Sequence, residues 1–521
     1  MRWTHKAAVA AGCAAMLVTA ACSSSSTGTA ATSSTSAANA GSAPAGSSSA
    51  PAPSAAGSAS APAGSMTAGS APSASAPAGS APAASASAGA APAGAALTKN
   101  PATDGKTINV LMVNNPQMID LQKLTAKNFT AQTGIKVNYT VLPEGDMRKK
   151  ATLEFTSQAG QYDVATLSNF EIPIYGSSDN NWLTDLTDYS KKDTSFNQSD
   201  IFPAFTKSLT VDGKLYGEPF YGESSFLMYR KDVLAAKGVT MPENPTWDQV
   251  AAAAAKLDGA QPGMKGICLR GKPGWGDFGA PLTTVINTFG GTWWDKDWNA
   301  KVNDPATVAA VKFYTDLVKQ HGEVSPDQAS FPECLNALQQ GKVAMWYDAT
   351  SAAGSLEASD SPVKGKIGYA QAPVKSTKSS GWLYTWSWAM EKASKNQDAA
   401  WQFISWASSS AYENEVGKQL GWAQVPAGKR TSLYNNPQYT AAAGSFAPAT
   451  LKQLSAADPT NPGVQPRPTV GIQFVDINDF QAFGDDVTGK LAADVLAGGG
   501  SVDDWVKYAQ SKADAVGSKQ K

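Results

Sequence analysis

The chain has 521 residues and carries 42 Lys and Arg against 43 Asp and Glu. Residues 23–98 contain no charged and no aromatic side chain, so the 423 residues from Lys99 onward hold nearly all the charge, with a net value of −3. This balance excludes a nucleic-acid-binding protein that depends on a basic face, and 423 residues are enough to bury two cores.

Histidine is scarce, because only His5 and His321 occur. A multi-histidine metal site is therefore excluded, and a catalytic triad would need His321 itself. His321 lies between Lys319 and Gly322, a pattern typical of a helix C-terminus, where the helix dipole favours basic residues. We expect a structural role for His321, and we expect neither a metal ion nor another cofactor.

The first 21 residues have the pattern of an export signal. Arg2 and Lys6 precede the apolar run Ala7–Ala21, which is too short to span a bilayer. The run ends directly before Cys22, and small residues before a cysteine at this place resemble the lipid-attachment motif of bacterial lipoproteins. An ordinary secretory signal cut nearby is the alternative. We expect residues 1–21 to be a signal peptide and Cys22 to carry a lipid on the extracytoplasmic face of the cell membrane.

Residues 22–98 consist almost entirely of Ala, Ser, Pro, Gly and Thr. Repeats such as Ala61–Ser65 and Ala76–Ser80 mark low complexity. Such a segment has too little apolar surface to offset the entropy of ordering it. We expect a disordered tether that holds a folded domain away from the membrane.

Strands and helices then alternate along the chain. The apolar run 108–113 and the segments 137–141 and 164–167 predict strands, with helices between them, and further helices are predicted near 246 and 305. This βαβαβ order predicts an α/β class with a doubly wound sheet, whose ligands bind outside the carboxyl ends of the strands. Those ends carry Asn114, Asn115, Asn169, Phe170 and Glu171. No Gly-rich phosphate loop follows the first strand, so we expect no nucleotide.

Four segments combine aromatic rings with carboxylates, arginine or hydroxyl groups: 216–232, 266–276, 340–350 and 382–388. Sugars and sugar alcohols need this mixture, because rings cover C–H surfaces while carboxylates and arginine bind hydroxyl groups. In the last segment four large rings alternate with smaller side chains, so at least one should line a cleft: Trp382, Tyr384, Trp386 and Trp388. The cluster of Trp293, Trp294 and Trp298 is interpreted as packing.

Three charged or aromatic side chains carry the binding hypothesis. Glycine flanks Trp275 on both sides, which predicts a ring on a loop with little local packing, able to cover the apolar face of a ligand. Glu223 and Asp348 are expected to accept hydrogen bonds from its hydroxyl groups. For Arg270, which follows an apolar strand, a structural ion pair and a ligand contact are both open.

The same segments resemble a known family. Gly341–Met345 after a helix, and Tyr229–Asp232 after the 216–224 segment, are similar to recurring phrases of family 1 extracellular solute-binding proteins, the sugar-receptor lipoproteins of ABC importers. The phrases at Tyr221–Ser225, Arg270–Gly276 and Asp348–Thr350 resemble the receptors for sugar alcohols such as mannitol, sorbitol and arabitol.

This resemblance implies a periplasmic-binding-protein-like fold of two lobes with a hinge and a ligand cleft between them. It places residues 99–218 and 370–410 in lobe 1, and residues 219–369 and 411–515 in lobe 2. The implied ligand-binding residues are Asn115, Glu171, Tyr221, Glu223, Arg270, Trp275, Asp348 and Trp386. It also implies a monomer without catalytic residues that delivers a sugar alcohol or sugar to the permease subunits of an ABC transporter.

Alternatives stay open at this point. A secreted glycosidase could use a carboxylate pair such as Glu223 and Asp348, and a lipoprotein that senses sugars would share the same cleft. Cys268 and Cys334 could form a disulfide, which export permits, or remain two buried thiols.

Overall fold

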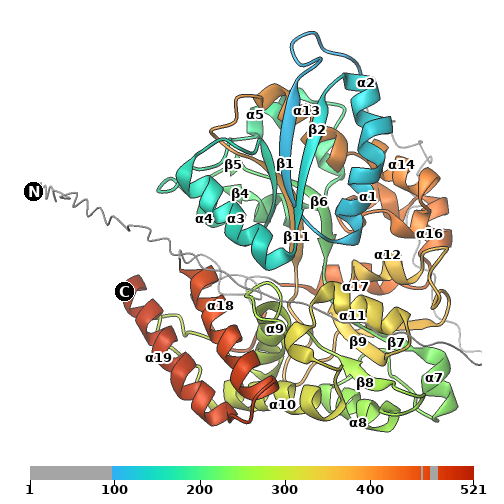
Figure 1. Ribbon diagram of the computed structural model, residues 1–521, viewed down its shortest axis with the longest axis vertical. Coiled ribbons are helices and arrows are strands. Elements are labelled where there is room, and N and C mark those ends of the chain that lie inside the picture. The colour runs from blue at the N-terminus through green and yellow to red at the C-terminus, as the bar shows by residue number, and fades with distance from the viewer. Residues whose placement is uncertain (1–96, 459–461, 470–478) are drawn as a thin grey trace, which may run out of the picture. The chain divides into compact units, whose positions relative to one another are not determined.

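The computed structural model describes residues 97–458, 462–469 and 479–521, which belong to one compact unit that spans Ser87–Lys521. The predicted signal peptide, Cys22 and nearly all of the tether lie outside the described residues. Among the described residues, no helix has the length and apolar character needed to cross a membrane. Strands form two larger sheets, and Figure 1 shows the first above the second.

The first sheet has the strand order β2-β1-β3-β11-β6. Strands β1 (Thr107–Val113), β2 (Lys136–Leu142) and β3 (Val164–Ser168) are parallel, whereas β11 (Tyr384–Met390) runs antiparallel to both β3 and β6 (Glu218–Glu223). Helices α1 (Pro116–Thr125) and α3 (Glu144–Ser157) connect the parallel strands. The predicted βαβαβ order is confirmed. Strands β1 and β3 are buried along most of their length, as their apolar runs indicate.

The second sheet has the order β10-β7-β9-β8. Its strands are β7 (Ser225–Arg230), β8 (Lys265–Cys268), β9 (Val343–Ala349) and β10 (Ile367–Gln371), of which only β8 and β9 pair in parallel. Helices α8 (Trp247–Leu257), α9 (Gly279–Phe289), α10 (Pro305–His321), α11 (Phe331–Gln339) and α17 (Ala447–Ala456) accompany this sheet. His321 ends α10 and contacts Asp258 at 3.1 Å, which confirms its structural role.

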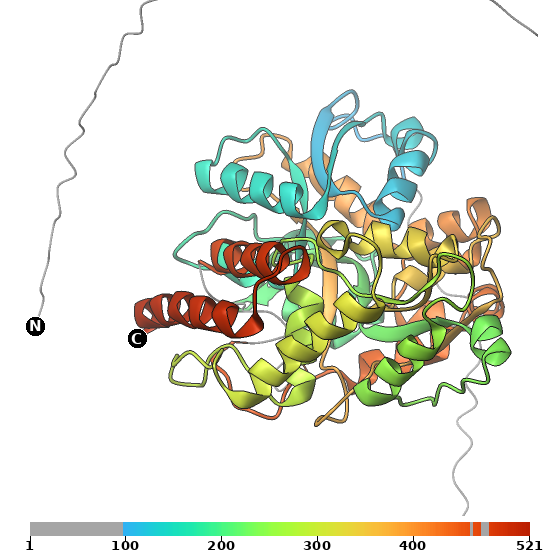
Figure 2. The ribbon, with the colours of Figure 1, turned by 60° about the horizontal axis from the view of Figure 1, so that its bottom comes forward.

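The C-terminal helices pack together beside this second group. Figures 1 and 2 both show α18 (Phe480–Lys490) next to α19 (Val502–Gln520). The rings of Trp293 and Trp294 pack on Phe483 of α18, and Trp294 Nε1 donates to the carbonyl oxygen of Ala513 in α19 at 2.9 Å. The predicted packing role of this tryptophan cluster is confirmed.

The chain passes between the two sheets more than once, and the pairing corrects two of the expected lobe boundaries. Strand β6 was expected in lobe 2, which was placed from residue 219, but it pairs with β11 in the first sheet, so the first passage is at Ser224. Helix α14 (Ser410–Gln419) was expected in the second lobe from residue 411, yet its Tyr412 packs on Phe220 and Trp406. Strand pairing over a long sequence separation decides the first position and ring packing the second, and no local pattern encodes either contact.

The structure shows whether the two cysteines of the folded part are bridged. Cys268, at the end of β8, and Cys334, in α11, form a disulfide, and both are fully buried. The bridge ties the start of α11 to the end of β8. Residues just after β8 and residues at the start of α11 line a cavity.

Candidate ligand-binding site

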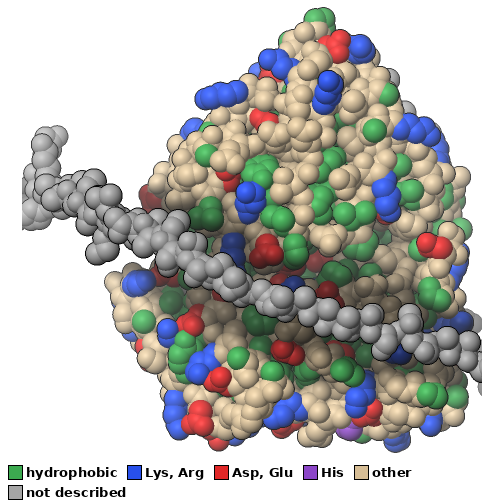
Figure 3. All heavy atoms as spheres, viewed as in Figure 1, with side chains coloured by type: hydrophobic (Ala, Val, Ile, Leu, Met, Phe, Trp, Pro, Cys, Tyr) green, Lys and Arg blue, Asp and Glu red, His purple; other side chains and the backbone are tan. Residues whose placement is uncertain are grey.

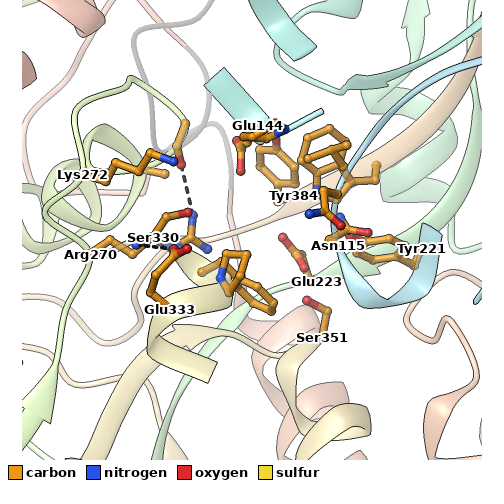
Figure 4. A pocket seen from close by; sticks show the side chains of 18 of the residues that line it. Asn115, Glu144, Tyr221, Glu223, Arg270, Lys272, Ser330, Glu333, Ser351 and Tyr384 are labelled. Atoms are coloured by element: carbon orange, nitrogen blue, oxygen red, sulfur yellow. Dashed lines mark hydrogen bonds between the residues drawn. The ribbon is translucent and has the colours of Figure 1, made fainter. Parts of the chain in front are cut away.

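A cavity of about 140 Å³ lies where the carboxyl end of the first sheet faces the second sheet. Figure 4 shows its labelled residues in two groups on opposite sides. The first group comes from the first sheet and its helices: Asn115, Glu144, Tyr221, Glu223 and Tyr384. The second group comes from the second sheet and α11: Arg270, Lys272, Ser330 and Glu333. In Figure 3, acidic, basic and hydrophobic side chains mix on the face where the molecule is hollowed.

Arg270 extends from the end of β8 into this cavity. Its Nε and Nη2 donate to Asp348 of β9 at 2.8 and 2.6 Å, and its Nη1 donates to the carbonyl oxygen of Gly276 at 3.2 Å. Burial alone would lower the pKa of Arg270, but the Asp348 carboxylate raises it above the ordinary value. Arg270 therefore forms the structural ion pair, and this ion pair orients a guanidinium group that also lines the cavity.

Asp348 does not line the cavity, contrary to our expectation. Its carboxylate is completely buried and also accepts from Trp346 Nε1 at 3.0 Å. These contacts occupy both oxygens, so the structure places Asp348 behind Arg270 as its orienting partner. Strand β9 is buried on both faces, so the side chain of Asp348 points into the protein and contacts a neighbour there. The sequence near Asp348 does not show that this neighbour is Arg270.

Asn115, Tyr221 and Glu223 form the opposite wall. Asn115 Oδ1 caps α1 by accepting from Met118 N at 3.3 Å, and its Nδ2 donates to Tyr221 Oη at 2.7 Å. Burial raises the pKa of Glu223 to about 8, although the Ser351 hydroxyl and Arg270 act to lower it. Glu223 therefore carries a proton near neutral pH and can both donate to and accept from a hydroxyl group.

Three of the four alternating rings line the cavity, namely Trp382, Tyr384 and Trp386. The fourth, Trp388, is completely buried and packs on Phe220 and Phe403. The prediction that at least one of these rings lines a cleft is confirmed. The rings supply the apolar surface that the polar wall lacks.

Glu171 is fully buried behind the wall and does not line the cavity. It accepts from Arg148 Nη1 at 2.6 Å and from both the backbone N and the hydroxyl group of Ser168, at 2.8 and 3.0 Å. All three donors bond to Oε2 and belong to the first lobe. The structure thus separates Glu171 from the residues that face the cavity.

Trp275 lies outside the cavity lining as well, although its neighbour Gly276 belongs to it. Only 1% of Trp275 is exposed; the Arg148 guanidinium lies 4.3 Å from its ring centroid and the Phe480 ring 4.7 Å away. The expectation of a loosely packed ring is therefore wrong. The local Gly-Trp-Gly pattern could not reveal that Arg148 and Phe480, both remote in sequence, would enclose it.

Several cavity residues were missed by the sequence reasoning. Glu144 accepts from Arg148 Nη2 at 2.7 Å, and this i, i+4 pair on α3 is a signal that was available. Glu333 accepts from Ser330 N at 3.1 Å in a capping box that starts α11, and Ser330-x-x-Glu333 is a readable motif. Lys272 and Ser351 carry no comparable signal.

The cavity lining offers both hydrogen-bond donors and hydrogen-bond acceptors, and its residues do not form a metal centre. Among the described residues, one group of three could hold a metal ion, Cys268, Glu323 and Cys334, but its two sulfur atoms form the disulfide. The cavity instead mixes cationic donors, carboxyl groups and rings. Such a lining binds a small neutral molecule with many hydroxyl groups.

Comparison with known proteins agrees with this chemistry. The family model for bacterial extracellular solute-binding proteins matches residues 115–414. The chain is a bacterial extracellular solute-binding protein. This solute-binding protein is 38% identical over 412 residues to the mannitol-binding protein of Pseudomonas aeruginosa, which covers 78% of this chain and 92% of that protein. It is 28% identical over 337 residues to the erythritol/L-threitol-binding protein of Mycolicibacterium smegmatis, covering 60% of this chain and 68% of that protein.

Solved structures show the same fold. The solute-binding protein of an ABC transporter from Agrobacterium vitis S4, with bound D-mannitol, matches with a TM-score of 0.77 and 40% identity, covering 80% of this chain and 99% of that one. A maltose-bound protein of T. maritima, 21% identical, matches with a TM-score of 0.66 over 78% of this chain and 99% of that one. The two-lobed α/β fold is thus confirmed. These relatives are described as binding proteins, so this solute-binding protein groups with receptors and not with glycosidases.

Proposed function

We propose that this chain is the receptor of an ABC importer, which captures a sugar alcohol between its two lobes and delivers it to the permease in the membrane. The observation that supports this most is the cavity between the lobes, which aromatic rings, Arg270 and Glu223 line together. The relative with bound D-mannitol shares 40% of its sequence with this chain. A cavity of about 140 Å³ lies below the ~300–1,000 Å³ of sites for drug-sized ligands, which favours one short polyol over an oligosaccharide.

A thermal-shift screen followed by calorimetry tests the ligand class. D-mannitol, sorbitol, arabitol and ribitol are compared with glucose and maltose. A polyol at a hundredfold its dissociation constant stabilises the native state by about 2.7 kcal/mol, which raises the melting temperature measurably. Stabilisation by maltose alone, or by none of these compounds, would contradict the proposal.

We further propose that Cys22 carries the lipid that anchors this receptor to the membrane, with residues 23–98 as the tether. The support is the apolar run that ends in small residues directly before Cys22. Cys22→Ser is expected to release the protein into the medium, measured by immunoblotting of cell and medium fractions, while polyol binding is retained. Cys13, which lies inside the apolar run Ala7–Ala21, provides the matched control, and Cys13→Ser should leave the protein with the cells. A Cys22→Ser protein that stays in the membrane fraction would disprove the anchor.

A further inference from the structure

Arg148 lies between two indole rings that belong to different lobes. Its guanidinium is 4.7 Å from the ring centroid of Trp386 on β11, in the first lobe, and 4.3 Å from that of Trp275, in the loop after β8 of the second lobe. The Arg148 side chain is almost completely buried. A cation held between two ring faces and shielded from water interacts with them more strongly than one at the surface.

The charge of Arg148 is balanced by carboxylates of the first lobe. It donates to Glu171 at 2.6 Å, to Glu144 at 2.7 and 3.0 Å, and to the hydroxyl group of Tyr384. If the lobes separated, these partners would stay with Arg148 and only the contact with Trp275 would be lost. The contact between the lobes can therefore break without leaving a buried charge unpaired.

Trp275 is in turn fixed by the second lobe. Its backbone N donates to Asp485 of α18 at 3.1 Å, its ring packs on Phe480, and the N of the preceding Gly274 donates to Thr488 at 3.0 Å. The ring is thus presented to Arg148 by α18, which Figure 1 shows below α3. Both halves of the contact are held rigidly by their own lobe.

Gly276 permits this close approach. A Cβ atom at this position would lie 2.2 Å from Glu144 Oε1 and 3.0 Å from Arg148 Nε, so a larger residue would displace these two side chains or push the lobes apart. Gly276 and Glu144 both line the ligand cavity. The contact between the lobes therefore continues directly into the wall of the ligand site.

We propose that Arg148 and Trp275 form a clasp that holds the two lobes together over the bound ligand and so sets how slowly the ligand leaves. The clasp rests on the proposed function, because it needs a ligand enclosed between the lobes. Arg148 and Trp275 are positioning residues, since they act on the ligand through Glu144, Tyr384 and Gly276, which line the cavity. A weaker clasp populates the open form more, which lowers the apparent affinity by the same factor.

The test measures D-mannitol binding by equilibrium dialysis, and its dissociation rate by isotope chase, on the full chain. Trp275→Leu and Arg148→Lys should each raise the dissociation rate about tenfold or more, while the association rate changes by less than about threefold. Trp275→Phe keeps a ring and should restore most of the affinity. Gly276→Ala should weaken binding as well, because its methyl group displaces the Glu144 and Arg148 side chains or holds the lobes apart.

Arg430→Lys is the matched control. Arg430 is also fully buried and lies over one ring, Phe196 at 4.8 Å, but its hydrogen bonds to Ser408 and Phe196 stay among segments that pack with the first sheet. This variant should lower the melting temperature and leave the dissociation rate unchanged. If Trp275→Leu behaves like Arg430→Lys, Trp275 is a core residue only and the clasp is wrong.

The double variant separates a clasp from two independent ligand contacts. Arg148→Lys combined with Trp275→Leu should accelerate dissociation no more than the stronger single variant, because both remove one shared contact. Effects that multiply would overturn the clasp.

Different experimental results would refute the proposed function and the clasp. Wild-type protein that binds no sugar alcohol refutes the proposed function alone. The clasp is then tested without ligand by energy transfer between dyes attached to exposed positions of the two lobes, which Arg148→Lys should reduce and Arg430→Lys should not. Unchanged energy transfer in Arg148→Lys would refute the clasp.

Discussion

Glu223 faces the cavity from the end of β6 with a carboxyl group whose pKa burial raises to about 8. Nearby charges act in both directions, since Arg270 lowers this pKa while Asp348 and Glu144 raise it. A neutral ligand that displaces water buries the group further and raises its pKa again. Binding should therefore take up a proton, which links polyol affinity to pH.

We expect the affinity for D-mannitol to fall as the pH rises from 7 to 9, by up to about tenfold per pH unit above pH 8. Glu223→Gln cannot titrate, and its affinity should be independent of pH in this range. Glu218→Gln is the control, because Glu218 lies on the same strand with a pKa also raised to about 8 by burial, yet outside the cavity. Calorimetry at pH 6, 7, 8 and 9 measures the effect. A pH dependence that persists in Glu223→Gln would assign it to another group.

At the scale of elements, the disulfide connects two segments that supply the second wall of the site. Cys268 is two residues before Arg270, and Cys334 directly follows Glu333 at the start of α11. The start of α11 is also held by its capping box and by Ser330, whose hydroxyl group donates to Asp277 at 2.7 Å. The bridge therefore contributes to the stability of the lobe and to the position of Arg270 and Glu333 together.

Replacing both cysteines, in Cys268→Ala with Cys334→Ala, should lower the free energy of unfolding by about 4 kcal/mol, as expected for a closed loop of 66 residues. The affinity for D-mannitol should fall too, because α11 loses its covalent link to β8. Guanidinium denaturation with and without reductant measures the first effect, and calorimetry the second. Equal denaturation midpoints for oxidised and reduced wild-type protein would show that the bridge does not stabilise the fold.

At the scale of the whole molecule, several buried carboxyl groups make stability depend on pH. Burial raises the pKa of Glu218, Glu223 and Glu323 to about 8 from the ordinary glutamate value of 4.5. The folded chain therefore binds more protons than the unfolded chain between these values. The stability that they contribute is fully present below pH 4.5 and is lost as the pH rises through 8.

The ligand-free protein should consequently melt at a higher temperature near pH 6 than at pH 9. Thermal unfolding followed by circular dichroism at both pH values measures the difference. Glu218→Gln and Glu323→Gln remove two of the three groups without altering the cavity lining, and each should reduce the difference. A melting temperature that rises from pH 6 to pH 9 would contradict this account.

The sequence predicted the parts of this molecule that depend on local patterns. Continuous apolar runs gave β1 and β3, and the polar residues after β1 led to Asn115, which lines the cavity. Contacts between remote segments were not predictable. Trp275 was placed on the ligand because its neighbours are glycines, whereas Arg148 and Phe480 enclose it.

Asp348 is a second residue whose contacts could not be predicted from the local sequence. Its residue type and its place at the end of β9 suggested a ligand contact, but the structure pairs its carboxylate with the guanidinium of Arg270. Which of the two charges faces the cavity depends on how the pairing of β8 with β9 brings their ends together, and the sequence near either residue does not encode this pairing.

The place of β11 in the first sheet also has a consequence for how the chain folds. Strand β6 pairs only with β11 among the described residues, and β11 also covers the free side of β3. A growing chain therefore presents two unpaired strand edges until Tyr384–Met390 has been made. Closing so long a loop is slow, and open edges favour pairing with other chains. Fragments that stop before residue 384 should aggregate, whereas fragments that include β11 can complete the first sheet.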